Sequence, residues 1–424
     1  MSLSTFGTLP PGVLTVPVPF TIAVSSVQQN QLTKLVRQAA IGVPTYYNTH
    51  TDTTNNTSYG LSRDWLVHAQ DVWTSPREYS WREEQKRLNR YPHFRINVTT
   101  SISSSTSGGG GGGDDTKETF DLHFAGLFSR NRTATPVLLM HGWPGSWFEF
   151  APLLDLLAAK YTPDTLPYHI VVPSLPDYGL STRSGETARE LSRHGAAAAM
   201  DGLMGALGFG GGYVVQGGDL GSIVAQVLCG TFEGCKALHL NLYFMSAEQR
   251  AAVADIPITP DEQARLALGA AWDATGRAYA IEHSTRPATI ALALSTNPLA
   301  MLAWVGEKFI EWSDNRYPLS LNTILSMASF YWFTNSFGRG MWGYSLAGGP
   351  LPSLVTSKPF GFSSYLREIA SVPQAWAEHL FPNLVFYKAH DRGGHFAALE
   401  QPELFLQDLE EFVAIVAPNV TGSH

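Results

Sequence analysis

The stretch VVQGGDLGS at residues 214–222 decides the fold of this 424-residue chain. An apolar run leads into a turn in which glycines stand two positions before and two positions after Asp219. A sharp strand-to-helix turn needs small residues at these places, because larger side chains would collide with the backbone. The helical pattern SIVAQVL follows directly. The stretch predicts a nucleophile elbow with the carboxylate of Asp219 at its apex, and the alternative is a plain strand–helix turn with an N-capping aspartate.

Short apolar runs alternate with helical patterns on both sides of this turn. The runs are 136–140, 169–175, 213–216, 237–244, 359–366 and 383–390, and they are preceded by 119–127, in which apolar and polar residues alternate. Such alternation is typical of a mainly parallel α/β sheet that is covered by helices on both faces. Residues 251–345 interrupt it with helical, Ala/Leu/aromatic-rich sequence and predict an inserted helical cap. We therefore expect a core at 119–250 and 346–424 around this cap, preceded by an N-terminal arm region at 1–118.

The expected arm region contains three helical patterns and one low-complexity segment. The helices are predicted from Gln28 to Ala40, from Leu61 to Trp73 with Ser62 as N-cap, and from Trp81 to Leu88. Six glycines at 108–113 predict a mobile hairpin tip. They are not followed by Lys-Ser/Thr, so a phosphate-binding loop is excluded.

Composition restricts the classes of function and the location of the chain. With 28 basic and 36 acidic residues the net charge is −8, which argues against nucleic-acid binding. There is no apolar run of the ~20 residues that would span a bilayer, and no basic region precedes the apolar residues 11–25, so we expect a soluble cytoplasmic protein. Cys229 and Cys235 lack zinc-site spacing and are expected to be buried, reduced thiols. The sequence contains no ligand-spaced metal set, so neither a metal nor a cofactor is expected.

The turn HGWPG at 141–145 follows the apolar run 136–140 and precedes the elbow in the chain. In hydrolases of the α/β class, the turn at this place supplies one backbone N–H of the oxyanion hole, and the residue after the nucleophile supplies the other. These residues are Trp143 and Leu220 in this sequence. Trp143-Pro144 is also a candidate cis peptide bond, because such bonds occur in tight functional turns.

A histidine base and an orienting acid are expected after the elbow. His395 lies in the glycine-flanked loop GGHF just past the run 383–390, and His390 is its rival at the end of that run. The acid candidates between the elbow and this loop are Glu368, Glu378 and Asp391. Glu368 is favoured because it follows the strand-like run 359–366, which preserves the chain order nucleophile–acid–histidine.

Taken together, these motifs resemble the epoxide hydrolases of the microsomal type, and the soluble fungal members in particular. The resemblance covers nearly the whole chain. It rests on WR at 81–82, LNRYPHF at 88–94, HGWPGSW, GGDLGS, STNPLAMLAWVGEKFIEW at 295–312, FYWFTNSF at 330–337 and GGHFAALE. The poly-glycine segment departs from the family pattern. The resemblance implies an α/β-hydrolase fold with a helical cap and an N-terminal arm, and it implies Glu368 as the charge-relay acid.

The resemblance also implies the first half of a reaction on apolar aryl or alkyl epoxides. Asp219 would attack an epoxide carbon and form an ester, while Tyr279 and Tyr331 donate to the epoxide oxygen. Aromatic residues around Tyr331 suggest an apolar pocket; they are Phe330, Trp332 and Phe333. Detoxification or aromatic hydrocarbon catabolism is the implied role, and a homodimer is one implied assembly.

In the second half, His395 oriented by Glu368 would activate water to hydrolyse the ester and release a vicinal diol. The N–H groups of Trp143 and Leu220 would hold the tetrahedral oxyanion. One alternative is a haloalkane-type dehalogenase, which typically has Trp directly after the nucleophile, where this chain has Leu220. Another is a catalytically silent binding protein, which would have lost a catalytic residue or the elbow glycines. A serine esterase is disfavoured, since Ser222 is three positions past the apex.

Overall fold

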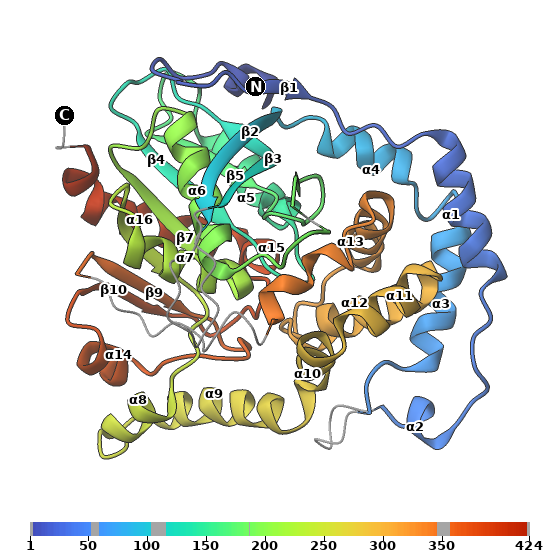
Figure 1. Ribbon diagram of the computed structural model, residues 1–424. Helices are drawn as coiled ribbons and strands as arrows, with labels where there is room; N and C mark the ends of the chain where they lie inside the picture. The colour runs from blue at the N-terminus through green and yellow to red at the C-terminus, as the bar shows by residue number, and fades with distance from the viewer. Residues whose placement is uncertain (1–2, 52–58, 103–115, 186, 346–356, 422–424) are drawn as a thin grey trace.

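The strands form one sheet in the computed structural model, which describes residues 3–51, 59–102, 116–185, 187–345 and 357–421. The strand order is β1-β2-β3-β5-β4-β7-β8-β9-β10, with β6 paired to β3 (Figure 1). The strands are β1 (Val18–Phe20), β2 (His93–Ile102), β3 (Thr116–Leu127), β4 (Thr135–Met140), β5 (Tyr168–Pro173), β6 (Thr182–Arg183), β7 (Tyr213–Gly217), β8 (Cys235–Leu240), β9 (Phe360–Ser364) and β10 (Leu384–Ala389). From β5 to β10 every pairing is parallel.

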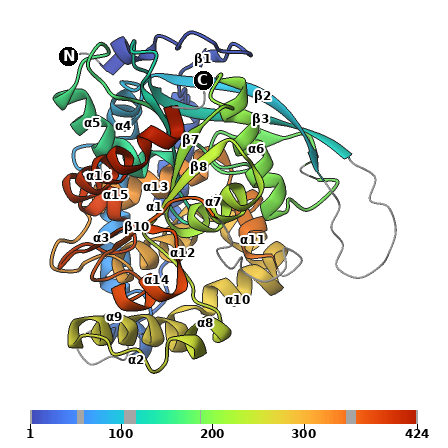
Figure 2. The same cartoon turned by 90° about the vertical axis from the view of Figure 1, so that its left-hand side faces the viewer.

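The central strands are buried along their whole length. Every residue of β4, β5 and β7 is buried. Helices α6 (Arg193–Ala206) and α7 (Asp219–Thr231) cover one face of the sheet, and α5 (Ala151–Lys160) and α16 (Pro402–Thr421) cover the other (Figure 2). Strands covered on both faces read as continuous apolar runs. This explains why the runs in the sequence predicted the parallel strands to within a few residues.

Strand β2 was not predicted from the sequence. It pairs antiparallel with β3 from His93↔Ala125 to Ile102↔Thr116, and β3 in turn pairs antiparallel with β5. The sheet therefore extends into the region expected to be an arm. Residues 108–113, for which a mobile hairpin tip is predicted, come between these two strands in the chain and are outside the described residues.

Helices fill the chain between β8 and β9 in the described residues. They are α8 (Ala247–Ala252), α9 (Pro260–Ala271), η4 (Trp272–Gly276), α10 (Ala278–Thr285), α11 (Pro287–Ser295), α12 (Pro298–Glu311), α13 (Leu321–Thr334) and η5 (Arg339–Tyr344). Side chains of Thr259, Asn297 and Ser320 cap α9, α12 and α13 at their first turns. The division of the chain into core, cap and arm stays a prediction.

The N-terminal helices lie against this helical segment (Figure 1). They are α1 (Ser26–Gln38), α2 (Tyr46–Thr49), α3 (Arg63–Thr74) and α4 (Trp81–Leu88), and Ser62 caps α3 as predicted. The indole of Trp73 and the hydroxyl of Tyr79 each donate to Ser329 Oγ of α13 at 3.0 Å. These buried bonds tie the N-terminal region to the helix that carries Tyr331.

The two cysteines correct a prediction. Cys229 of α7 and Cys235 of β8 form a disulfide, with their Cα atoms 5.1 Å apart. The expectation of reduced thiols was wrong, because the turn between α7 and β8 brings two residues close that are six positions apart in sequence. The cysteines therefore give no support to an intracellular location.

None of the described helices alone is long and apolar enough to cross a bilayer. Among them, only α11 and α12 taken together have the length and composition of a membrane span, and the two are bent by 120° relative to each other.

Candidate active site

The elbow places Asp219 at the junction of β7 and α7. Its φ is 45°, a left-handed conformation that a residue other than glycine rarely adopts. A Cβ on Gly217 would overlap the carbonyl oxygen of Gly221, and a Cβ on Gly221 would overlap the carbonyl oxygen of Met140. The two glycines therefore let the chain turn sharply enough to present the Asp219 side chain.

His395 joins two carboxylates in the buried site. Its Nδ1 lies 2.7 Å from Glu368 Oε1, and its Nε2 lies 3.1 Å from Asp219 Oδ2. The backbone N–H of Ile369 also donates to Glu368 Oε1 at 2.7 Å, which holds that carboxylate in place. Glu368 follows β9 and His395 follows β10, so the neighbouring parallel strands bring the two residues together.

The rival residues have other partners. His390 Nε2 lies 2.6 Å from Asp408 Oδ2, on the side of the C-terminal helix. Glu378 is exposed and accepts from Gln374, and Asp391 is exposed. None of the three has a hydrogen bond to Asp219 or His395 among the described contacts.

Electrostatics make His395 an imidazolium in the resting site. Burial by itself lowers its pKa, but the carboxylates of Glu368 and Asp219 outweigh burial and raise the pKa well above the usual value. At neutral pH the ring therefore carries a proton and forms an ion pair with Asp219. Esterification of Asp219 would remove that negative charge and favour loss of the ring proton.

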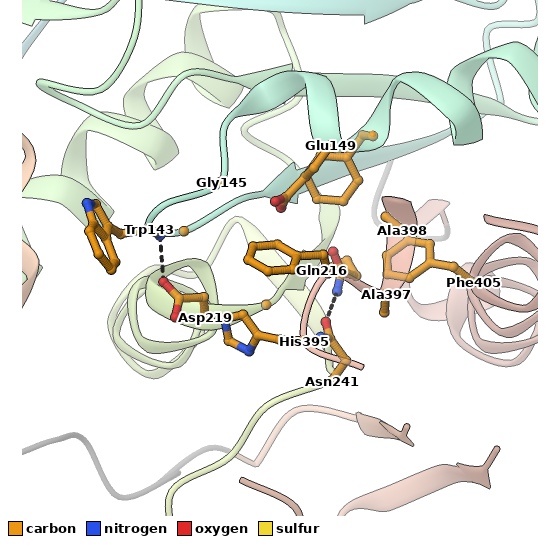
Figure 3. Close-up of a pocket in the computed structure, with 14 residues that line it drawn as sticks. Trp143, Gly145, Glu149, Gln216, Asp219, Asn241, His395, Ala397, Ala398 and Phe405 are labelled. Carbon is orange, nitrogen blue, oxygen red and sulfur yellow. Dashed lines mark hydrogen bonds and ion pairs between the residues drawn. The ribbon is translucent and has the colours of Figure 1, made fainter. Parts of the chain in front are cut away.

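The HGWPG turn holds the other oxygen of the Asp219 carboxylate (Figure 3). The backbone N–H of Trp143 donates to Asp219 Oδ1 at 2.6 Å, and the Trp143-Pro144 peptide bond is cis, as predicted. Among the described contacts the carboxylate accepts from Trp143 and His395, and no bond from the Leu220 N–H is formed. Oδ1 is held in this way, whereas Oδ2 lies beside His395 Nε2.

Two tyrosines from different helices contact the same turn. Tyr279 of α10 stacks on the Trp143 ring, with centroids 5.1 Å apart, and Tyr331 of α13 donates to the Gly145 carbonyl at 2.9 Å. Burial and then the Asp219 carboxylate raise the pKa of both phenols well above 10. Both therefore keep their protons and can act as hydrogen-bond donors.

The aromatic residues that were expected in a substrate pocket pack on several neighbours. Phe333 packs on Trp81 of α4 with ring centroids 5.0 Å apart, and Phe330 packs on Phe148 at 5.5 Å. Successive helical positions are 100° apart, so Phe333 points to the side of α13 opposite Tyr331. Trp332 is half-buried and does not line the chamber at Asp219. These contacts do not test the expectation that the three side chains line a substrate pocket, which stays a prediction.

A different aromatic set surrounds Trp143. The Tyr344 ring lies 5.8 Å from the rings of both Trp143 and Tyr279, and Phe337 and Trp312 each lie 6.3 Å from Trp143. Sequence reasoning missed Tyr344, which lies in a short helix after α13 with no motif to mark it. This set forms an apolar wall beside the Asp219 carboxylate.

Three polar residues near Asp219 were also missed. Glu149, Gln216 and Asn241 line a chamber of about 20 Å³ together with Asp219 and His395 (Figure 3). Gln216 Nε2 donates to Asn241 Oδ1 at 2.8 Å. Glu149 belongs to the motif-bearing run HGWPGSWFE, which is the one sequence signal that could have drawn attention to it. Within the described residues, no group of three His, Cys, Asp or Glu side chains is arranged to hold a metal ion.

Comparisons with known proteins agree over nearly the whole chain. The family model described as the epoxide hydrolase N terminus matches residues 17–150, and that of the alpha/beta hydrolase fold matches residues 135–402. A putative epoxide hydrolase of Dothistroma septosporum is 39% identical over 97% of this chain and 93% of its own length. Epoxide hydrolase 1 of Sus scrofa is 27% identical over 84% of this chain and 81% of its own. The structure of Aspergillus niger epoxide hydrolase superposes with a TM-score of 0.83 at 39% identity, covering 97% of this chain and 99% of that one.

Proposed function

This chain belongs to the epoxide hydrolases of the α/β-hydrolase fold, and on that basis we propose that it converts apolar epoxides to vicinal diols through an ester on Asp219. One observation carries the mechanism. The Asp219 carboxylate lies at the apex of the elbow, with one oxygen bound by the Trp143 N–H and the other beside His395. A carboxylate needs no deprotonation at neutral pH, so it is ready to attack.

In the first step Asp219 Oδ2 attacks an epoxide carbon, and the bond from that carbon to the epoxide oxygen breaks. The oxygen becomes an alkoxide and takes a proton from Tyr279 or Tyr331. The contacts of both tyrosines with the 143–145 turn support this role, because the same turn binds the Asp219 carboxylate through the Trp143 N–H. Their raised pKa values keep them protonated until the alkoxide forms.

In the second step water attacks the ester carbonyl carbon, and His395 takes the proton from that water. The negative oxygen of the tetrahedral intermediate is Oδ1, which already accepts from the Trp143 N–H. Collapse of the intermediate breaks the bond between the carbonyl carbon and the alkyl oxygen, which takes the proton from His395 and leaves as the diol. The carboxylic acid that forms on Asp219 then gives its proton to His395, which restores the carboxylate and the ion pair. Glu368 stabilises the imidazolium that forms, through its contact with Nδ1.

The proposed substrates are hydrophobic aryl or alkyl epoxides. The support is the aromatic wall around Trp143, whose members are largely buried: Tyr279, Tyr344, Phe337 and Trp312. Such a surface favours apolar groups beside a few well-placed polar atoms. Detoxification or catabolism of aromatic hydrocarbons is the corresponding proposed role.

A single turnover in oxygen-18 water tests the proposal. With enzyme in excess over styrene oxide, the covalent scheme places the label in the Asp219 carboxylate and none in the first diol. Replacement of His395 by Ala should leave the ester in place, seen as a mass increase of one substrate on the peptide that contains Asp219. Label in the first diol with none in Asp219 would refute the ester, and halide release from haloalkanes without diol formation would favour a dehalogenase.

A further inference from the structure

The chamber of about 20 Å³ lies beside Asp219 and is bounded by Glu149, Gln216, Asn241, His395 and the 142–145 turn. Neither Tyr279 nor Tyr331 is among the described residues that line it. The chamber therefore reaches Asp219 and His395 through residues other than the two tyrosines that the proposed mechanism assigns to the epoxide oxygen. A reactant in the chamber would lie beside the Asp219 side chain.

Polar atoms in the chamber wall lack partners within the described part of the protein. Gln216 is fully buried, and its Oε1 accepts no hydrogen bond there, although its Nε2 is bound to Asn241. An unpaired buried carbonyl of this kind destabilises the fold unless a donor reaches it. The orientation of Gln216 is thus fixed by Asn241, and its oxygen is left to bind a donor from the chamber.

Glu149 supplies a second polar group. Its carboxyl points into the space between the elbow and the 143–145 turn (Figure 3), and it forms no hydrogen bond with the other described residues. Burial raises its pKa to about 8, with His395 opposing and Asp219 adding to the effect. At neutral pH most of the Glu149 carboxyl is protonated, so it can both donate and accept a hydrogen bond.

The size of the chamber suits one water molecule. A bound water needs roughly 10–15 Å³ of this kind of volume and two to four polar partners. The chamber provides about 20 Å³ and is lined by Glu149 and Gln216, whose carboxyl group and Oε1 are the two polar partners proposed for the water. The remaining walls are mostly apolar and would leave a water few other orientations.

We propose that Glu149 is a positioning residue that holds the hydrolytic water of the second half-reaction in this chamber, with Gln216 Oε1 as its second anchor. The inference rests on the proposed ester mechanism. Once Asp219 is alkylated, His395 loses its ion-pair partner, its Nε2 proton returns to the tyrosinate left by the first step, and the neutral ring acts as a base toward the water. The water oxygen bonds to the ester carbonyl carbon, one proton goes to His395 Nε2, and Glu149 keeps its own proton throughout.

The test separates the two half-reactions of the full-length enzyme in single turnovers with styrene oxide. Intact-protein mass after rapid quenching follows the formation and the decay of the ester. Glu149→Leu and Gln216→Met should each slow decay roughly 10- to 100-fold, since misplacement of a reacting group costs about this much, while ester formation stays within about threefold. Glu149→Gln, which keeps a donor and an acceptor, should restore decay to within about threefold of the wild type.

Glu400→Gln is the matched control. Burial also raises the pKa of Glu400, to about 7, but its oxygens accept from the backbone N–H groups of Asp314 and Phe396 and do not line the chamber. Glu400→Gln should therefore leave the ratio of the rates of ester formation and ester decay unchanged. Wild-type decay in both Glu149→Leu and Gln216→Met would overturn the water site, as would a parallel fall of both steps. If the wild type formed no ester with any epoxide, the proposed function itself would fail.

Discussion

Replacement of Glu368 by Gln should slow hydrolysis of the ester about a thousandfold and leave its formation nearly intact. The amide keeps the shape of the side chain but removes the negative charge 2.7 Å from His395 Nδ1. That charge stabilises the imidazolium that forms when water is deprotonated. For charge centres about 4 Å apart at an effective dielectric constant of about 20, the attraction is about 4 kcal/mol, or close to three powers of ten in rate.

The measurement is a single turnover with styrene oxide, quenched at intervals and analysed by mass. Ester formation should stay within about tenfold of the wild type, because Asp219 attacks without help from a base. Decay should become slow enough for the esterified Asp219 peptide to accumulate. Glu378→Gln is the control, because this exposed carboxylate contacts Gln374 and not the histidine. If the rate of ester hydrolysis fell less than tenfold in Glu368→Gln, or fell equally in Glu378→Gln, the assignment of Glu368 as the residue whose charge stabilises the imidazolium would be refuted.

Three further predictions follow from other contacts. Tyr331→Phe and Tyr279→Phe should each slow ester formation about 100-fold, as expected for loss of a general acid. Tyr331→Phe should also lower the free energy of unfolding by about 1 kcal/mol, because the hydrogen bond to the Gly145 carbonyl is lost. Wild-type rates of ester formation in both variants would exclude the role of the two tyrosines. Gly221→Ala should cost roughly 1–3 kcal/mol of stability because its Cβ overlaps backbone of β4, and an unchanged melting temperature would contradict the close approach. The pKa of Glu149 is raised from 4.5 to about 8, so its contribution to stability is present at low pH and is lost as pH rises through this window. The melting temperature of the wild type should therefore fall relative to Glu149→Gln between pH 5 and pH 8, and parallel curves would show that the carboxyl is not buried uncharged.

The sequence indicated the features that depend on a few neighbouring residues. The elbow is local, because Gly217 and Gly221 are required by the backbone within one turn. The parallel strands could also be predicted from the sequence, because strands that are buried on both faces are continuously apolar. Strand β2 was not predicted although its apolar positions alternate with polar ones, and its pairing with β3 is a contact across residues 103–115 that no local pattern indicates.

Only the tertiary structure distinguished among residues of the same type. Glu368 and Glu378 are both plausible acids in the sequence, but the pairing of β9 with β10 brings Glu368 alone to His395. The direction of each aromatic side chain on α13 depends on which neighbours the helix meets, so Phe333 faces Trp81 while Tyr331 reaches Gly145.

The chamber at Glu149 and Gln216 likewise has no signature in the sequence. Its walls come from the HGWPG turn, β7, the segment after β8 and the loop after β10, which are brought together only by the sheet order. The sequence by itself determined the elbow that carries Asp219, because backbone sterics act over a few residues. Which acid, which aromatic rings and which buried polar groups lie near Asp219 was decided by packing between segments far apart in the chain.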